Sequence, residues 1–139
     1  MTSLKQFLMI VALISSSTCA YADWEKINSV AKNTNLFIDK STAEISGPNW
    51  IKLWHIVDYA SVQDYEGKPF QSIKATFEYD CNNLRFRELI RILHAESMGN
   101  GMTVYWTHGL WSMTNDPSTW IQPAENSIEA SLVTAVCSN

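Results

Sequence analysis

The sequence has few of the features that mark an enzyme or a nucleic-acid-binding protein. It contains no G-x-S-x-G, P-loop, G-x-G-x-x-G or H-E-x-x-H motif, so the patterns of common hydrolases, nucleotide-binding proteins and zinc proteases are missing. Basic residues are also scarce, since 10 Lys and Arg stand against 14 Asp and Glu, a formal net charge of -4. Because neutralisation of phosphates by basic side chains dominates affinity for duplex nucleic acid, we expect no nucleic-acid partner.

Metal ligands and long apolar runs are scarce as well. The three histidines, His55, His94 and His108, lack a metal-ligand spacing such as H-x-x-x-H, so a zinc site would require them to meet in space. The longest apolar run, residues 7–14, is shorter than the roughly 20 residues that a membrane-spanning helix needs. We therefore expect no cofactor and no transmembrane segment.

The first 22 residues, by contrast, have the three parts of a secretory signal peptide. Lys5 supplies a positive charge, residues 7–14 are apolar, and Ala-Tyr-Ala at residues 20–22 fits the small-x-small cleavage rule. We predict an exported domain over residues 23–139, a length typical of one domain. Lipidation of Cys19 is the alternative, although Ser-Ser-Thr at residues 16–18 fits a lipoprotein signal badly. A lipid would tether the same domain to a membrane.

Two cysteines remain in that domain, Cys81 and Cys137. In a small exported domain an even pair is most simply a disulfide. It would close a loop of 56 positions, which the chain-entropy model associates with roughly 4 kcal/mol of stability. A catalytic or metal-binding thiol pair is the alternative, although neither a C-x-x-C spacing nor a neighbouring histidine supports it.

The clearest secondary-structure signal is a hairpin. Apolar and polar residues alternate without a break over residues 72–81, which is typical of a half-buried antiparallel strand. Asn82-Asn83 suits a two-residue turn, and residues 84–95 then return as the partner strand. This register pairs apolar with apolar and opposite charges with each other: Cys81 with Leu84, Tyr79 with Phe86, Asp80 with Arg85 and Glu78 with Arg87.

Other segments extend the predicted sheet. The Asn100-Gly101 turn should fold residues 102–108 back onto the 84–97 strand. Residues 50–59 are apolar on both faces, which indicates a central strand covered on both sides. The remaining expectations are a short strand over residues 35–40, a turn around residues 46–48, and a strand or a helix over residues 24–30.

The spacing of apolar residues changes from that of a strand to that of a helix near the C-terminus. From Ala124 onward apolar residues recur at helical spacing, and Pro123 suits the first turn of a helix. We predict an amphipathic helix over residues 123–136 that brings Cys137 to Cys81. The predicted fold class is therefore α+β: an antiparallel sheet of about five to six strands, a C-terminal α-helix packed on it and one disulfide.

The charged residues of the hairpin suggest a binding surface. If period two continues, Arg85, Arg87 and Arg91 fall on one strand face, Lys74 joins them from the neighbouring strand, and Trp106 extends the face. Because Arg and Trp are enriched among interface hot spots, we predict these five as binding residues. The alternative is a solvated face on which the arginines pair with cross-strand carboxylates, each pair worth less than about 1 kcal/mol.

Aromatic residues are abundant, with six Trp, five Tyr and five Phe. Packing in the core is the default interpretation for most of them. Trp50 and Trp54 share one strand face, so they need either the helix or a partner surface over them. A pocket lined by such rings would favour a small apolar ligand.

Short motifs distributed over residues 24–137 can also be compared as a set: Trp54-x-x-Val57-Asp58-Tyr59, Ser72-x-Lys74-x-x-x-Glu78-Tyr79-Asp80-Cys81, Arg85-x-Arg87, Met98-Gly99-x-Gly101, Trp120 and Cys137. Together they resemble the surface-adhesin protein E family of Gram-negative bacteria. The resemblance implies an antiparallel sheet with a C-terminal helix, a disulfide, a tendency to form homodimers and no catalytic activity.

The resemblance also implies a function. It indicates an exported, non-enzymatic protein-binding module that acts as a surface adhesin and binds host extracellular-matrix or serum proteins. In that family the stretch matching Arg85 and Arg87 is associated with ligand binding. The alternative is a small periplasmic protein that inhibits a hydrolase or binds an apolar ligand. We therefore expect a protein partner, and a location in the periplasm or at the outer-membrane surface.

Overall fold

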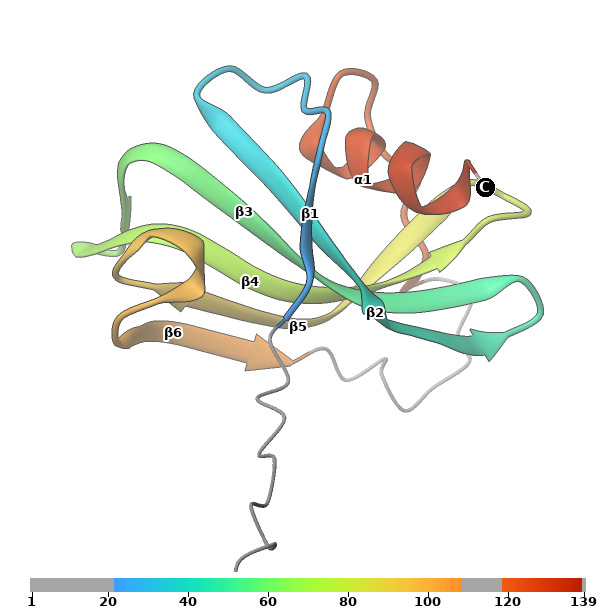
Figure 1. Ribbon diagram of the computed structural model, residues 1–139, viewed down its shortest axis with the longest axis horizontal. Helices are drawn as coiled ribbons and strands as arrows, with labels where there is room; N and C mark the ends of the chain where they lie inside the picture. The colour runs from blue at the N-terminus through green and yellow to red at the C-terminus, as the bar shows by residue number, and fades with distance from the viewer. Residues whose placement is uncertain (1–21, 109–118, 139) are drawn as a thin grey trace, which may run out of the picture.

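Six strands follow one another along the chain, and each pairs antiparallel with the next, so the sheet has the order β1-β2-β3-β4-β5-β6. The computed structural model describes residues 22–108 and 119–138. Helix α1 lies across one face of the sheet (Figure 1). The elements are β1 (Trp24–Ile27), β2 (Thr34–Gly47), β3 (Trp50–Tyr65), β4 (Lys68–Asp80), β5 (Arg85–His94), the 3-10 turn η1 (Ser97–Gly99), β6 (Thr103–His108) and α1 (Ile128–Cys137).

The predicted α+β class is confirmed by this sheet, its single C-terminal helix and the disulfide. The predicted signal peptide, apart from Ala22, and the alternative lipid site at Cys19 lie outside the described residues.

The predicted hairpin is formed by β4 and β5. Its turn is wider than the two-residue loop expected, because residues 81–84 lie outside both strands. The Asp80 carboxylate accepts hydrogen bonds from the backbone N–H groups of Asn82 and Asn83, at 3.1 and 3.3 Å, and these bonds stabilise the wider turn. The register is nevertheless the predicted one: Tyr79 pairs with Phe86, Asp80 with Arg85 and Glu78 with Arg87.

The three N-terminal strands are longer or better defined than the sequence indicated. The central strand predicted over residues 50–59 is β3, which continues to Tyr65. Residues 24–27 form a strand, β1, rather than a helix. The strand predicted over residues 35–40 was too short, because β2 resumes its pairing with β3 after a register shift between Asp39 and Glu44.

The C-terminal helix begins later than predicted. Asn126 has a left-handed backbone with φ of 57°, which interrupts any helix that would start at Pro123. The Ser127 hydroxyl then accepts a hydrogen bond from the Ala130 N–H at 3.0 Å and caps α1. The prediction that Pro123 lies in the first helical turn was therefore wrong, whereas the helix itself is present.

The core lies between α1 and the sheet. Leu132 of α1 is fully buried, as are Leu36 of β2 and Tyr79 of β4. The predicted disulfide joins Cys81, beside the β4–β5 turn, to Cys137, the last residue of α1. It holds the helix over this face of the sheet, which we call the helix face; the opposite face is called the open face.

The connection between β5 and β6 differs from a simple Asn-Gly turn. Residues 102–108 do fold back onto β5, as predicted. The turn spans residues 95–102, includes η1, and is closed by a hydrogen bond from the Ala95 N–H to the Met102 carbonyl at 3.0 Å. Gly101 has φ of 77°, and a Cβ there would lie 2.7 Å from the Glu96 carboxylate, so this position requires glycine.

Candidate functional site

The three predicted binding arginines do not share one face. Glu78 pairs with Arg87 and Phe77 with Glu88, but Thr76 pairs with Ile90, so Leu89 is an extra residue in β5. Such a bulge shifts the alternation by one position. Arg91 therefore pairs with Ala75 and lies on the helix face, whereas Arg85 and Arg87 lie on the open face. The predicted common face was wrong, because a period-two pattern does not reveal a bulge.

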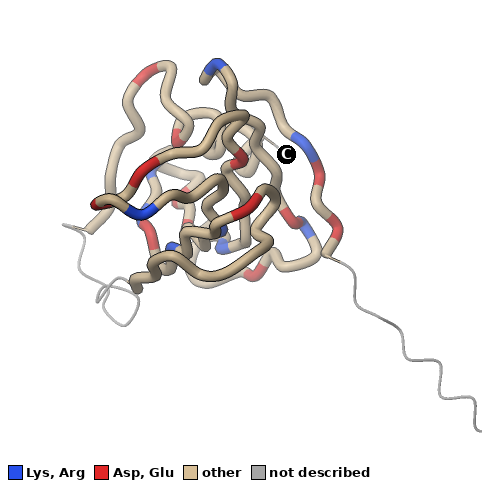
Figure 2. Tube along the Cα trace, turned by 90° about the vertical axis from the view of Figure 1, so that its left-hand side faces the viewer, with Lys and Arg blue, Asp and Glu red and all other residues tan. Residues whose placement is uncertain are grey.

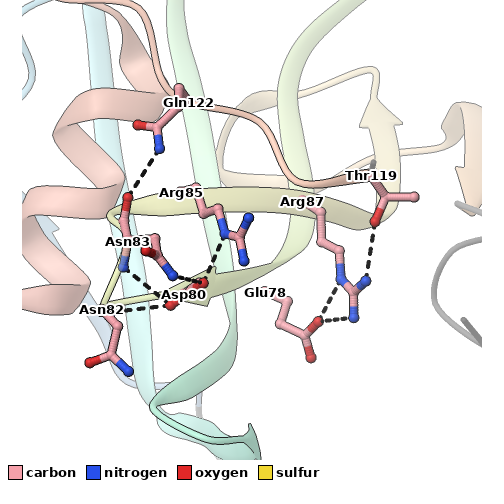
Figure 3. A network of polar contacts seen from close by, with 8 residues as sticks. All are labelled: Glu78, Asp80, Asn82, Asn83, Arg85, Arg87, Thr119 and Gln122. Atoms are coloured by element: carbon pink, nitrogen blue, oxygen red, sulfur yellow. Dashed lines mark hydrogen bonds and ion pairs between the residues drawn. The ribbon is translucent and has the colours of Figure 1, made fainter. Parts of the chain in front are cut away.

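Arg87 is buried rather than presented to solvent. Its side chain is only 5% exposed and pairs with the Glu78 carboxylate at 2.5 Å. Its Nη1 donates to the Thr119 hydroxyl at 3.1 Å (Figure 3). The guanidinium also lies 4.5 Å from the ring centroid of Trp120 and 5.6 Å from that of Trp50. These contacts make Arg87 a structural residue of the open face.

Arg85 has a similar environment at the end of the same strand. Its Nε donates to the Asp80 carboxylate at 2.8 Å, and its guanidinium lies 5.1 Å from the Trp120 ring centroid. Burial alone would raise the pKa of Asp80, but hydrogen bonds from Asn83 and Arg85 outweigh it and place that pKa below its ordinary value. The cross-strand carboxylate pairs weighed in the sequence analysis are thus present.

Lys74 and Trp106 lie on the open face, as the sequence predicted. Lys74 pairs with Ile56 and Ile92, and Trp106 pairs with Ile92. The Lys74 ammonium lies 5.2 Å from the ring centroid of Trp54 and 5.8 Å from that of Trp24, which is the geometry of cation–π contacts. Trp106 is 61% exposed, so most of its ring is accessible beside these residues.

Two short segments cover the ends of the open face. At one end the Asp58 carboxylate accepts hydrogen bonds from the Ser97 hydroxyl at 2.8 Å and from the Met98 N–H at 2.9 Å. At the other end the backbones of Phe86 and Ile121 exchange two hydrogen bonds, of 3.0 and 2.8 Å. The second segment carries Trp120. Among the described residues, these two segments leave the middle of the face uncovered.

The segment that carries Trp120 packs over Trp50. The Trp50 ring centroid lies 5.1 Å from that of Trp120. From the sequence, either the helix or a partner surface was expected over Trp50 and Trp54. For Trp50 the cover is instead a segment of the same chain that precedes α1, whereas Trp54 borders the open middle of the face.

The open middle is a groove with a volume of about 790 Å³. Its floor is mainly apolar, and Trp106 with His108 stands at one side, their rings stacked 5.6 Å apart. An ion pair of 3.3 Å between Lys52 and Glu44 lies at its border. The lining residues, which we call the groove, are Thr42, Glu44, Lys52, Leu53, Trp54, Thr76, Leu89, Ile90, Ile92, Trp106 and His108.

Most of the groove floor was not among the predicted binding residues. In β5, Leu89 and Ile90 are adjacent, and Ile92 and Leu93 follow after Arg91. Adjacent apolar residues break a period-two pattern and are a signal for a strand that is covered on both faces. Figure 2 shows Lys and Arg interspersed with Asp and Glu along the chain, without a large block of one sign.

The histidines do not converge on a metal site. His55 is buried on the helix face, 4.5 Å from the Phe77 ring centroid, whereas His108 lines the groove on the other face. Burial, with a smaller effect of the Arg91 charge, lowers the pKa of His55 to about 3. Within residues 22–108 and 119–138, no group of three or more His, Cys, Asp or Glu is placed to hold a metal ion.

A second hollow of about 630 Å³ lies between β1, β2 and α1. Its walls include short polar side chains such as Ser131 and Thr134, and no aromatic residue. The groove is therefore the better candidate site, since exposed aromatic side chains on an apolar floor are typical of binding surfaces. Among the described residues, no helix has the length and apolar character needed to cross a membrane.

Comparisons with known proteins agree with this architecture. The structure of Haemophilus influenzae protein E matches with a TM-score of 0.57 and 12% sequence identity, covering 86% of each chain. Its crystal form II gives the same score and identity and covers 90% of the matched chain. Protein E from non-typeable Haemophilus influenzae matches with a TM-score of 0.53 and 14% identity, over 82% of this chain and 76% of that one.

At these identities the structural matches establish the fold alone. A search of curated protein sequences found no significant match. The sequence does match the family model described as Surface-adhesin protein E over residues 24–138, which is nearly the whole predicted exported domain. The chain therefore belongs to the surface-adhesin protein E family.

Proposed function

We propose that this chain is an exported, non-enzymatic adhesin that binds a host extracellular-matrix or serum protein through the groove. The observation that carries the proposal is Trp106, an indole 61% exposed beside an apolar hollow of about 790 Å³. Membership of the adhesin family supports binding of a protein at the cell surface. Exposed apolar surface of this kind is typical of an interaction site.

Within this proposal the predicted binding residues have different roles. Trp106 contacts the partner directly, and Lys74 borders the hollow that continues the groove past Trp54. Arg85 and Arg87 act indirectly, because they hold Trp120 and the segment around it against the open face. Arg91 lies on the other side of the sheet and has no role in the groove.

A direct binding measurement tests the proposal. Purified chain is applied to immobilised extracellular-matrix and serum proteins, and the Trp106→Ala variant is compared with the unmodified chain. We expect about 30-fold weaker binding, the effect of losing a hot-spot side chain worth about 2 kcal/mol. Val30→Ala is the matched control, since Val30 is 56% exposed but lies beside α1. Equal binding by both variants would contradict the proposal.

A small apolar ligand is the second candidate for the same groove. Its volume falls within the range of small-molecule sites, and Trp54 and Trp106 line it. Titration with a long-chain fatty acid, followed by tryptophan fluorescence, distinguishes the two functions. Saturable binding at micromolar concentration that is lost in Trp106→Ala, together with no binding of the immobilised matrix and serum proteins, would favour the small ligand.

A further inference from the structure

We propose that the protein partner is held as an extended strand, added to the outer edge of β6 with alternate side chains over the groove. This inference rests on the proposed function. It specifies how the groove and the neighbouring edge of β6 would bind the main chain of the partner protein. Addition of a strand to an exposed sheet edge is a common mode of peptide recognition, in which main-chain hydrogen bonds give affinity and alternate side chains give specificity.

Within residues 22–108 and 119–138, no strand pairs with the outer edge of β6. The sheet order ends at β6, and in the part of the chain that the structure describes, residues 103–108 have no backbone hydrogen bonds beyond the ladder with β5. Where β5 extends past β6, by contrast, the edge is covered, because Phe86 bonds with the Ile121 backbone. The described residues thus protect the β5 part of this edge but not β6.

The composition of β6 favours pairing with a further strand. Its six residues, Thr-Val-Tyr-Trp-Thr-His, are mainly β-branched or aromatic and include no Pro, Gly, Lys, Arg, Asp or Glu. Edge strands are usually protected by charges, proline or very short length. The opposite edge, β1, has this protection: it is four residues long and contains Glu25, which pairs with Lys40 at 3.1 Å.

Part of β6 is regular enough to accept a strand. The register shift between Leu93 and His94 makes Val104 the irregular residue, so Tyr105–His108 is the regular part. Two of its side chains are already held in place: the Tyr105 ring centroid lies 4.6 Å from that of Tyr65, and Trp106 stacks on His108. A strand edge ordered before binding loses less entropy when the partner is bound.

The two sides of β6 indicate the chemistry of the partner. Trp106 and His108 border the apolar groove, whereas Thr107 borders a hollow of about 380 Å³ that combines the ion pair of Arg91 with Glu88 and aromatic or apolar side chains such as Phe70 and Leu93. Successive side chains of a strand point to opposite faces. The occupant is therefore an extended polypeptide segment that alternates, with apolar side chains beside Trp106 and, beside Thr107, side chains that combine an apolar part with a polar end.

Peptide selection followed by backbone methylation tests this inference. Random twelve-residue peptides displayed on phage are selected on the purified chain, and peptides that fail to bind Trp106→Ala are kept. Each kept peptide is then synthesised with a single N-methyl group at every position in turn. Strand addition predicts at least about tenfold weaker binding at every second position and less than about twofold at the others, because only alternate N–H groups face β6.

The outcomes separate this inference from the proposed function. Peptides that depend on Trp106 but show no period-two methylation effect would overturn strand addition and leave the groove as the binding site. Failure to select any such peptide would also overturn strand addition. Peptides and matrix proteins that bind equally well to Trp106→Ala would instead overturn the proposed function.

Sedimentation of the purified chain tests the competing occupant, a second copy of this chain. We expect one selected peptide to bind per chain. The sedimentation coefficient should change only by the small amount that the mass of the peptide explains, so that the number of chains in the particle stays the same. A dimer that dissociates when the peptide binds would show that a second copy occupies the β6 edge, and would overturn the proposal of a heterologous partner.

Discussion

The two faces of the sheet bury their residues by different means. On the helix face, apolar side chains of α1 and the strands pack together, and a disulfide holds the helix in place. On the open face, buried carboxylates pair with arginines, and Trp120 lies over those arginines. A strand with alternating polar residues therefore need not have a solvated side. In the part of this protein that the structure describes, the polar side is covered at both ends, and the groove lies between the two covered parts.

The largest expected effect concerns the helix face. Replacing both Cys81 and Cys137 by Ser should lower the free energy of unfolding by about 4 kcal/mol, because the 56-position loop is no longer closed in the unfolded chain. Urea denaturation measures the change. Reduction of the unmodified chain should give the same loss, and a difference of less than about 1 kcal/mol would show that packing alone holds α1.

The next effect concerns the buried ion pair of the open face. Glu78→Gln should lower the free energy of unfolding by about 3 kcal/mol, because it removes the buried carboxylate that faces Arg87. Glu44→Gln is the control, since the pair of Glu44 with Lys52 is exposed and should contribute less than about 1 kcal/mol. Urea denaturation measures both losses. Similar losses in the two variants would contradict the expectation that the buried pair of Glu78 with Arg87 contributes more to stability than an exposed pair.

The free energy of unfolding should depend on pH because of His55, which is buried on the helix face. The pKa of His55 is lowered from 6.5 to about 3 in the folded chain, so the unfolded chain binds a proton below pH 6.5 that the folded chain does not. Stability from this residue should therefore fall by about 2 kcal/mol between pH 7 and pH 5. Urea denaturation of the chain and of His55→Leu at both pH values checks this.

In this experiment His55→Leu should lose most of the pH dependence between pH 7 and pH 5. His108→Asn is a suitable control, because His108 lies on the other face of the sheet and leaves His55 in place. Equal slopes for the unmodified chain and His55→Leu would show that other groups cause the dependence.

The smallest effect on stability is expected in the groove. Trp106→Ala should change the free energy of unfolding by less than about 0.5 kcal/mol, because the side chain is 61% exposed. The same substitution should weaken partner binding strongly, as proposed above. Thermal denaturation provides the stability measurement, and a loss comparable with that of Glu78→Gln would place Trp106 among the residues that hold the fold.

The sequence predicted the fold better than the site. The β4–β5 register followed from matched pairs such as Asp80 with Arg85, and the disulfide from two cysteines in an exported domain. Trp106 and Lys74 were placed on the correct face. The grouping of Arg91 with the other arginines failed, because one additional residue, Leu89, reverses the alternation. The start of α1 was also misplaced, since the positive φ of Asn126 was not foreseen.

By itself, the sequence determined the local features: the alternation of residues 72–81, the hairpin pairs and the cysteine pair. These depend on neighbours along the chain or on directly opposed residues. Only the tertiary structure decided which charged residues are exposed. Arg87 is buried because Trp120, 33 positions away, lies over it, and no period in the sequence specifies such a long-range contact.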